Sequence, residues 1–408
     1  MNRFGSFAML IVVAATSACD KPTPVRAPEK IDYSLVRRDE LAKLPDGTNI
    51  VFPIAKGNHL SGRTYGLMDE NGTVLIRPSF NYVSQTSAGR LPRPYGYWCG
   101  QEGALLRSPK VWLYVGKYGS RAMKPQDYGD YLLNLGDSLF VIGDQVLNNR
   151  SPTDAHGFIP SGVFDPSGQW NPPEGILPRG WLSEGLVPIT DANGLAGYAD
   201  RKGNVVIDPQ FAYAAPFYDG LAAVGVGERY GYIDRTGEVV IQPQFTHVSW
   251  FENGLAIVSD GGEETIPWVI DRKGNQINAL RSGRVPRSKH NLRGFENGLL
   301  LSDVTETNPV TGELEGWYGF LCPDDTWAIE PTLTRAVGFT DKVTIVTGPV
   351  SMGGEDHQVP HLCDQNGNLV ARVQTASWNV FKFGLAGDEQ GEDGYVDTQG
   401  NTIWKPDR

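Results

Sequence analysis

The residues with the clearest chemical character form a basic segment at positions 279–293, ALRSGRVPRSKHNLR. The segment stands out because the whole chain has a formal net charge of −11. The ordinary interpretation of such a segment is a solvated surface loop, and the functional alternative is a contact for an anion, a lipid headgroup or a partner protein. The candidate contact residues are Arg281, Arg284, Arg287, Lys289, His290 and Arg293.

A second group of side chains has the types that bind zinc, since His357, His361 and Cys363 fall within seven residues. Pro360 excludes a helix that would place both histidines on one face, and no second cluster stands at ligand spacing. We therefore predict ordinary loop and strand residues here, with no metal site and no cofactor.

Catalytic motifs are missing from the sequence. It contains no Gly-x-Ser-x-Gly elbow, no His-Glu-x-x-His, no P-loop and no dinucleotide fingerprint. Asp and Glu total 47, so a carboxylate pair for glycoside hydrolysis stays open, but no spacing singles out a pair. We predict no catalytic residues and place a hydrolase last among the alternatives.

Several tryptophans have the flat apolar rings that stack on sugars. In an array of repeats such rings more often pack between units, and that is the interpretation we favour. The candidates are Trp98, Trp112, Trp170, Trp181 and Trp250.

The elements that must position these residues belong to a tandem repeat, clearest in residues 194–224 and 230–258. Gly197 and Gly231 stand 34 positions apart, and so do Asp200 and Asp234. Each copy reads Gly-Tyr-x-Asp-x-x-Gly-x-Val-Val-Ile-x-Pro-x-Phe and then Phe-x-x-Gly-Leu-Ala-x-Val. This pattern resembles the bacterial WG repeat. The resemblance implies units that pack mainly against their neighbours and says little about chemistry.

One unit is predicted to be a three-stranded meander. Asp-Arg-Thr-Gly at positions 234–237 has the form of a tight hairpin turn, because Asp accepts a backbone hydrogen bond and Gly supplies a positive φ. Proline cannot donate to a ladder, so the repeated proline should end a strand or lie at an edge. These prolines are Pro78, Pro209, Pro243 and Pro331, and the phenylalanines expected to plug the core between units are Phe80, Phe211 and Phe245.

The predicted fold class is therefore all-β, with tandem three-stranded β-meander repeats of about 34 residues in an open superhelical or propeller-like array. We count eight units. Residues 49–160 contain the first WG-like repeat and an irregular aromatic-rich insertion, and residues 161–408 contain the rest of the array. Residues 84–160 are either a decorated insertion or two eroded repeats, with strand-like runs at 111–115 and 139–142.

The N-terminus has the features of an export signal. Arg3 precedes an apolar run at 7–15 that is too short to span a bilayer, and small residues then precede Cys19. Residues 1–18 resemble a bacterial lipoprotein signal peptide with Cys19 as the lipidated residue, and the alternative is an ordinary signal cut after Ala18. Residues 19–48 are rich in Pro and charge and form a tether. We expect a lipid-anchored protein of the bacterial cell envelope facing the periplasm, with Asp20 slightly favouring the inner membrane over the outer.

Charge and cysteine content narrow the function further. A sequence pI near 5.1 argues against nucleic acid as a partner. Cys322 and Cys363 occupy positions offset by one residue in their units, so we expect no disulfide between them. The leading hypothesis is a non-catalytic envelope lipoprotein that acts as a β-repeat interaction scaffold for a protein partner. The alternative is glycan or peptidoglycan binding.

Overall fold

The computed structural model describes residues 50–56, 64–80, 82–83, 85–86, 103–107, 112–123, 131–145, 158–261, 265–285, 292–307, 314–339, 342–348, 359–372, 384–387 and 394–405. The chain divides into two units, Met1–Asp32 and Tyr33–Arg408, and all described residues belong to the second. The predicted signal peptide, Cys19 and the tether lie outside the described residues.

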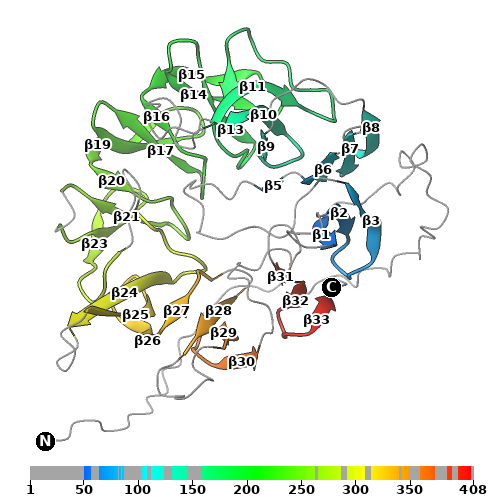
Figure 1. Cartoon of the computed structure of the whole chain (residues 1–408). Helices are drawn as coiled ribbons and strands as arrows, with labels where there is room; N and C mark the ends of the chain where they lie inside the picture. The colour runs from blue at the N-terminus through cyan, green and yellow to red at the C-terminus, as the bar shows by residue number, and fades with distance from the viewer. Residues whose placement is uncertain are drawn as a thin grey trace, which may run out of the picture. The chain divides into compact units, whose positions relative to one another are not determined.

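The described residues form strands and turns and contain no helix, which confirms the all-β prediction (Figure 1). The first sheet contains β1 (Phe52–Lys56), β2 (Thr64–Met68) and β3 (Val74–Phe80). The second contains β4 (Tyr82–Val83), β6 (Gly103–Arg107), β7 (Trp112–Gly116) and β8 (Gly119–Met123). The third contains β5 (Gln85–Thr86), β9 (Tyr131–Asn134), β10 (Phe140–Gln145) and β11 (Phe158–Phe164). The fourth sheet contains β12 (Leu177–Pro178), β13 (Leu186–Thr190), β14 (Ala196–Asp200) and β15 (Val205–Phe211). The fifth contains β16 (Tyr213–Ala214), β17 (Leu221–Val226), β18 (Arg229–Asp234) and β19 (Val239–Phe245). The sixth contains β20 (His247–Val248), β21 (Leu255–Ser259), β22 (Trp268–Asp271) and β23 (Gln276–Ala279). The seventh sheet contains β24 (Leu300–Thr307), β25 (Leu314–Leu321) and β26 (Trp327–Leu333). The eighth contains β27 (Arg335–Ala336), β28 (Val343–Thr347), β29 (His361–Asp364) and β30 (Leu369–Arg372). The ninth contains β31 (Leu385–Gly387), β32 (Tyr395–Asp397) and β33 (Thr402–Trp404).

The described residues thus give nine small sheets, one more than the eight units counted from the sequence. The additional sheet lies in the segment that sequence reasoning left open. There β4, β6, β7 and β8 form one sheet, and β9 and β10 join β11 and β5 in the next. The two strand-like runs expected in this segment correspond to β7 and β10.

The strand that follows each proline-containing strand joins a different sheet from the one predicted. The Gly-Leu-Ala-x-Val strand was expected to complete the meander of the unit before it. Instead β17 pairs with β18 of the following unit, Leu221 opposite Asp234, and a two-residue strand, β16, precedes it in the same sheet. Each typical sheet therefore begins with the end of one sequence repeat and continues into the next, which ties neighbouring repeats together.

The Asp-x-x-Gly turns form as predicted. Asp234 Oδ1 accepts hydrogen bonds from the backbone N–H of Thr236 at 2.8 Å and of Glu238 at 3.1 Å. Gly237 has a φ of +92°, which a residue with a side chain adopts only under strain. The same carboxylate contacts recur at Asp200, Asp271, Asp364 and Asp397.

The repeated proline lies in an edge strand, as expected, and the strand continues beyond it. Pro243 belongs to β19, the last strand of its sheet, and the pairing of β18 with β19 shifts register on both sides of Tyr232. Gly231 faces this irregularity at close range. A Cβ there would stand 2.3 Å from the Ile241 carbonyl oxygen and 2.7 Å from the Pro243 nitrogen, so the bent strand leaves room only for glycine. We call this pairing of Gly231 with Pro243 the glycine–proline couple.

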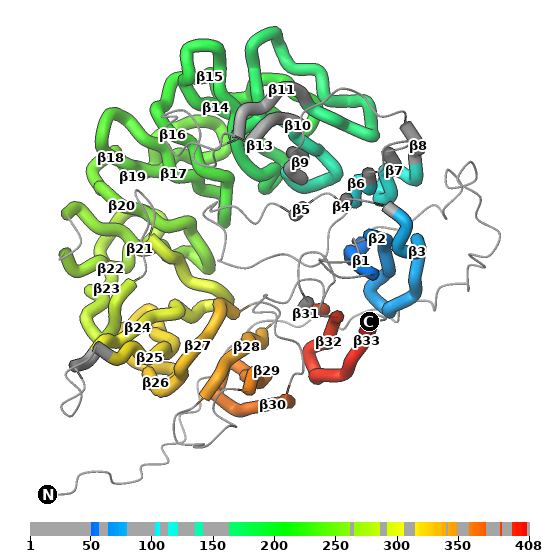
Figure 2. Tube along the Cα trace, viewed as in Figure 1, coloured from blue at the N-terminus to red at the C-terminus, as the bar shows by residue number. Residues whose placement is uncertain are grey.

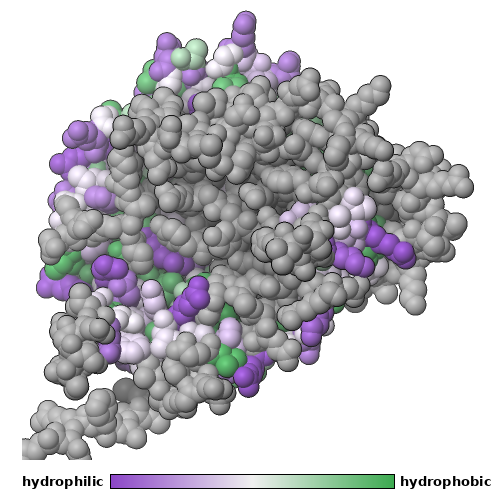
Figure 3. All heavy atoms as spheres, viewed as in Figure 1, coloured by the Kyte–Doolittle hydropathy of each residue, from purple (hydrophilic) through white to green (hydrophobic). Residues whose placement is uncertain are grey.

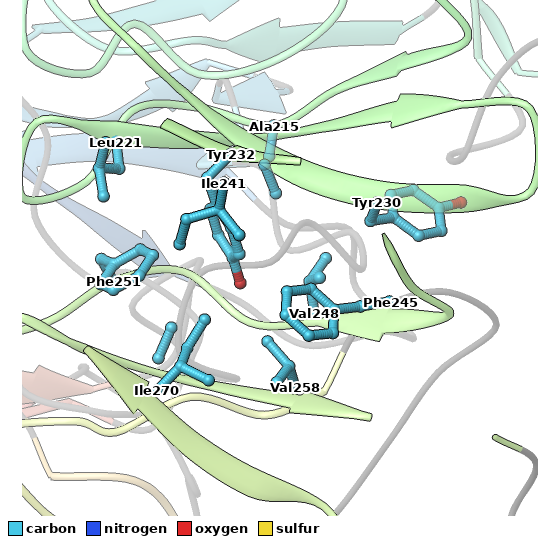
Figure 4. Packing of buried hydrophobic residues seen from close by; sticks show 12 residues of the cluster. Ala215, Leu221, Tyr230, Tyr232, Ile241, Phe245, Val248, Phe251, Val258 and Ile270 are labelled. Atoms are coloured by element: carbon cyan, nitrogen blue, oxygen red, sulfur yellow. The ribbon is translucent and has the colours of Figure 1, made fainter. Parts of the chain in front are cut away.

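The cores lie between sheets, and each central strand serves two of them. Leu221 and Ala223 of β17 pack in the cluster shared with the sixth sheet, whereas Ala222 and Val224 pack in the cluster shared with the fourth. Figure 4 shows the first of these clusters, with Tyr232 of the fifth sheet near residues of the sixth. Phe211 and Phe245 are 6% and 4% exposed in these clusters, which confirms them as core plugs.

The first sheet packs against the last. Phe52 of β1 and Tyr395 of β32 meet edge-to-face with ring centroids 5.5 Å apart, and the Tyr395 hydroxyl donates to the Pro53 carbonyl oxygen at 2.7 Å. Ile54, Met68 and Leu385 complete this buried cluster. Contact between the two ends of the repeat series favours the propeller-like arrangement over an open superhelix; Figure 2 follows the chain from one end to the other.

Candidate interaction surface

The basic segment begins directly after β23 and its first part is fixed by backbone contacts. Asp325 Oδ1, in the turn between β25 and β26, accepts hydrogen bonds from the N–H of Arg281 at 2.8 Å and of Ser282 at 3.0 Å. The Ser282 hydroxyl donates to the Asp325 carbonyl oxygen at 2.9 Å. These contacts hold the backbone while the Arg281 side chain stays exposed.

Arg284 extends the seventh sheet by one residue. Its N–H donates to the Asp303 carbonyl oxygen at 2.8 Å, and Ser302 donates its hydroxyl proton to the Arg284 carbonyl oxygen at 2.8 Å. The guanidinium Nε lies 3.1 Å from Asp303 Oδ2, yet the Arg284 side chain is 77% exposed. An exposed charge on a fixed backbone can meet a partner without the cost of ordering the loop.

Arg293 differs from the other predicted contact residues and corrects the prediction. Its residue is only 6% exposed, and its Nε and Nη2 atoms donate to Glu296 Oε1 and Oε2, both at 3.2 Å. Burial beside a carboxylate removes this charge from the surface, so Arg293 is not part of the exposed basic segment. Arg287, Lys289 and His290 lie outside the described residues.

Glu252 and Glu296 form a pair of carboxylates that the sequence did not single out. Burial raises the pKa of Glu252 to about 7; the nearby Glu296 charge adds to the rise, and a hydrogen bond from the Gly298 N–H at 3.2 Å opposes it. Burial also raises the pKa of Glu296, against the effect of Arg293. Gly338 leaves room for the Glu296 carboxylate, because a Cβ there would collide with Oε2.

These glutamates belong to a series of tight turns that precede the central strands. Each of these turns has a non-glycine residue and then a glycine at positive φ, as at Asn253 (52°) and Gly254 (79°). A carboxylate from one turn accepts the glycine N–H of the next. The pairs are Glu184 with Gly220, Asp219 with Gly254, and Glu252 with Gly298. The acidic residues just ahead of Gly-Leu in the repeats were the available sequence signal.

A second charged network joins three sheets at Arg201. Arg201 Nη2 lies 2.7 Å from Asp165 Oδ1, and its Nε lies 3.2 Å from Asp137 Oδ2. The hydrogen bonds from Arg201, Ser167 and the Trp170 N–H lower the pKa of Asp165 to about 2, although burial opposes them. Lys117 also contacts Asp137. This network holds the second, third and fourth sheets together through their turns.

The remaining candidates are mainly structural. Trp181 and Trp250 are 8% and 9% exposed, and Trp250 Nε1 donates to the Phe295 carbonyl oxygen at 3.2 Å. Trp170 packs against the core cluster of the third and fourth sheets. Trp98 and the side chain of Trp112 lie outside the described residues.

The predicted metal-type side chains give no cluster in the part of the chain that the structure describes. His361 Nδ1 lies 2.9 Å from the Val359 carbonyl oxygen, and His357 is not among the described residues. Cys322 and Cys363 carry free thiols. Burial raises the pKa of Cys363 to about 12, so this thiol is a packing group rather than a nucleophile.

On the face shown in Figure 3 the described residues mix hydrophilic and hydrophobic side chains. The exposed large hydrophobic residues include Val206, Val240, Ile277 and Val370, which recur six positions after the turn residue of their units. Within the described residues no helix is long and apolar enough to cross a membrane.

Comparison with known proteins identifies the repeat itself. The family model for the WG containing repeat matches residues 197–230 and 230–263. None of the curated proteins matches the chain.

Among solved structures, BamB from Moraxella catarrhalis is 14% identical, with 78% of this chain and 96% of that chain covered and a TM-score of 0.34. A eukaryotic initiation factor is 10% identical, with coverages of 79% and 95% and a TM-score of 0.37. The WD40 β-propeller domain of Doa1 is 10% identical, with coverages of 50% and 69% and a TM-score of 0.24.

Proposed function

We propose that this protein is a non-catalytic interaction scaffold of the bacterial cell envelope, anchored to a membrane through Cys19, and that it binds a protein partner. The observation that carries the proposal is the anchored basic segment. Arg281 and Arg284 are exposed on a chain of net charge −11, and Asp325 and Asp303 fix their backbone. A rigid positive site on an acidic protein suits a partner with a complementary acidic surface.

The repeat array supports this role because its large side chains are used in packing between sheets. Tyr198, Tyr232 and Tyr395 are fully buried and each donates its hydroxyl proton to a backbone carbonyl oxygen. These side chains are thus used inside the array, and its exposed turns and edge strands supply the surface for a partner. Described tryptophans that pack inside give little support to the alternative, glycan binding.

The test is crosslinking in intact cells followed by pull-down and mass spectrometry. The variant Arg281→Glu/Arg284→Glu is compared with wild type and with Lys202→Glu/Arg229→Glu, which reverses two exposed charges elsewhere. A partner lost only in the first variant, and rebound by the purified wild-type protein, supports the proposal. Equal capture by all three proteins contradicts a role for the basic segment, and sedimentation with isolated sacculi would instead support glycan binding.

Membrane anchoring has its own test. Cells fed a radioactive or clickable fatty acid should label the wild-type protein and not Cys19→Ala. Labelled wild type and unlabelled variant support the lipid anchor, whereas an unlabelled wild-type protein released from the membrane by salt contradicts it. Fractionation of the two membranes then tests the inner-membrane preference expected from Asp20.

A further inference from the structure

We propose that β23 is a docking edge, to which an extended acidic segment of the partner protein adds as one more antiparallel or parallel strand. The inference deepens the proposed scaffold function and rests on it. It names the element that is bound through its backbone and the chemistry of the segment that binds. The strand ends the sixth sheet, whose order is β20-β21-β22-β23.

Most of the equivalent edge strands carry features that prevent strand addition; besides β23 the exception is β33, Thr-Ile-Trp, which is only three residues long. Proline removes a backbone donor, and a charged side chain in an edge strand opposes pairing with another chain. Such pairs are Arg77-Pro78 in β3, Asp208-Pro209 in β15 and Glu330-Pro331 in β26, while β19 has Gln242-Pro243 and β30 ends in Arg372. The strand β23, Gln-Ile-Asn-Ala, has neither a proline nor a charge.

The sixth sheet also lacks the glycine–proline couple that bends its neighbours. Trp268 stands where β18 has Gly231, and Leu280 stands where β19 has Pro243. As a result β22 and β23 show one register shift, between Val269 and Ile270, in place of two. Leu280 donates its N–H to the Pro267 carbonyl oxygen at 2.9 Å, a ladder bond that proline could not make. The last part of this edge is therefore regular.

The hydrogen-bond pattern identifies the backbone groups that face away from the sheet. Ala279 is paired opposite Trp268, and the Leu280 bond to Pro267 makes this a non-hydrogen-bonded pair. The N–H and C=O of Ala279 consequently point away from β22, toward the side where another strand would lie. Beside them Ile277 exposes 55% of its surface, an apolar contact for an added strand.

Charge at both ends of β23 defines the partner segment. Lys273 is exposed before the strand, next to Arg272, which is exposed but paired with Asp219, and Arg281 and Arg284 are exposed after it. An extended segment with acidic side chains and β-branched residues between them would meet cations at both ends of a neutral strand. The rest of an acidic chain repels such a segment, which adds specificity for this edge.

The experiment uses the full-length protein and a fluorescent probe, the acetylated and amidated peptide Thr-Val-Glu-Val-Asp-Val-Glu-Val-Thr. Fluorescence anisotropy should show saturable binding, and a probe with lysine at each acidic position should bind at least tenfold more weakly. Hydrogen–deuterium exchange of backbone amides in the region 276–281 should slow when the acidic probe is present.

Two substitutions at one position separate backbone pairing from side-chain effects. Ala279→Pro removes the outward N–H and leaves the ladder bond of Leu280, whereas Ala279→Val keeps the N–H. We expect at least tenfold weaker binding for Ala279→Pro and a change within twofold for Ala279→Val. If Ala279→Pro does not fold, two N-methylated probes give the same test, one methylated at the odd-numbered residues and one at the even-numbered residues. One of these probes should lose binding and the other should retain it.

The outcomes also separate this inference from the proposed function. Equal binding by Ala279→Pro and Ala279→Val, or unchanged exchange at 276–281, overturns the docking edge. If the cellular partner still depends on Arg281 and Arg284 while ignoring Ala279→Pro, the scaffold function stands and the edge site falls. Probe binding without a crosslinked partner in cells supports the edge and counts against the scaffold function.

Discussion

Gly231 lies against the backbone of Pro243, and a Cβ atom at position 231 would stand 2.7 Å from the Pro243 nitrogen. The same relationship holds between Gly66 and Pro78, Gly197 and Pro209, and Gly319 and Pro331. The glycine of the repeat is therefore required by close backbone approach rather than by a positive φ.

The first prediction concerns this couple. Gly231→Ala should lower the free energy of unfolding by about 3 kcal/mol, because backbone atoms cannot yield to the new methyl group. Gly316→Ala in β25 is the control; nothing lies within 4 Å of its Cβ position, so the change should stay within about 1 kcal/mol. Urea denaturation followed by fluorescence measures both, and equal stability of the two variants would contradict the role of the couple.

The second prediction concerns the hairpin turn at Asp234. Asp234→Ala removes the acceptor for the Thr236 and Glu238 N–H groups and should cost about 1 kcal/mol. Asp234→Asn keeps an acceptor oxygen and should cost less. The hydrogen bond from the Thr236 hydroxyl is the largest cause that lowers the pKa of Asp234, and the backbone hydrogen bonds add to it. The contribution of the carboxylate to stability should therefore be present near neutral pH and be lost as the pH falls through that lowered pKa. Denaturant titrations of the three proteins at pH 7 and pH 3 check both statements.

The third prediction concerns the buried ion pair. Glu296→Gln leaves the Arg293 guanidinium buried without its counter-charge, and this should lower the free energy of unfolding by about 3–5 kcal/mol. Arg272→Gln breaks the more exposed pair with Asp219, where the side chains are 47% and 37% exposed, and should cost at most about 1 kcal/mol. Thermal unfolding ranks the variants. A smaller loss for Glu296→Gln than for Arg272→Gln would show that the buried pair adds nothing.

The fourth prediction is a pH dependence centred on Glu252. Its pKa rises from 4.5 to about 7 on folding, so between these values the folded state binds more protons than the unfolded state. Its contribution to stability is therefore fully present below about pH 4.5, declines as pH rises through 7, and amounts to at most about 3 kcal/mol.

Glu252→Gln should remove this decline, because the amide stays neutral at every pH. The free energy of unfolding of wild type and variant, measured at pH 5 and pH 8, should differ more at pH 8, with the variant the more stable there. Asp219→Asn, in the equivalent series of turns but more exposed, serves as the comparison. Parallel pH curves for wild type and Glu252→Gln would contradict the raised pKa.

The local structure could be predicted from the sequence because its causes are local. The carboxylate of Asp234 reaches N–H groups two and four residues on, and the Gly237 conformation depends on the absence of its own side chain. The edge position of Pro243 follows from its missing donor. The WG containing repeat was recognisable for the same reason, in the two copies where local rules are obeyed most closely.

The candidate surface was predicted only in part. Arg281 and Arg284 are exposed as expected, but Arg293 is buried against Glu296, three residues further on. Spacing alone does not distinguish these outcomes, since the burial of Arg293 and Glu296 depends on surrounding groups such as Gly338. Glu252 was missed because its raised pKa comes from burial at a contact with the turn at Gly298, 46 residues away.

By itself the sequence determined the repeat, its period and the turn and edge chemistry of each unit, because these depend on residues within one repeat. The tertiary structure alone decided that the Gly-Leu-Ala-x-Val strand joins the next sheet, since either neighbour could have paired with it. It alone decided closure, which depends on Tyr395 reaching Pro53 across 342 positions of chain. It also showed the unprotected edge of β23. Trp268 and Leu280 replace the glycine and the proline there, and the effect of this replacement on the edge depends on how the strands are paired.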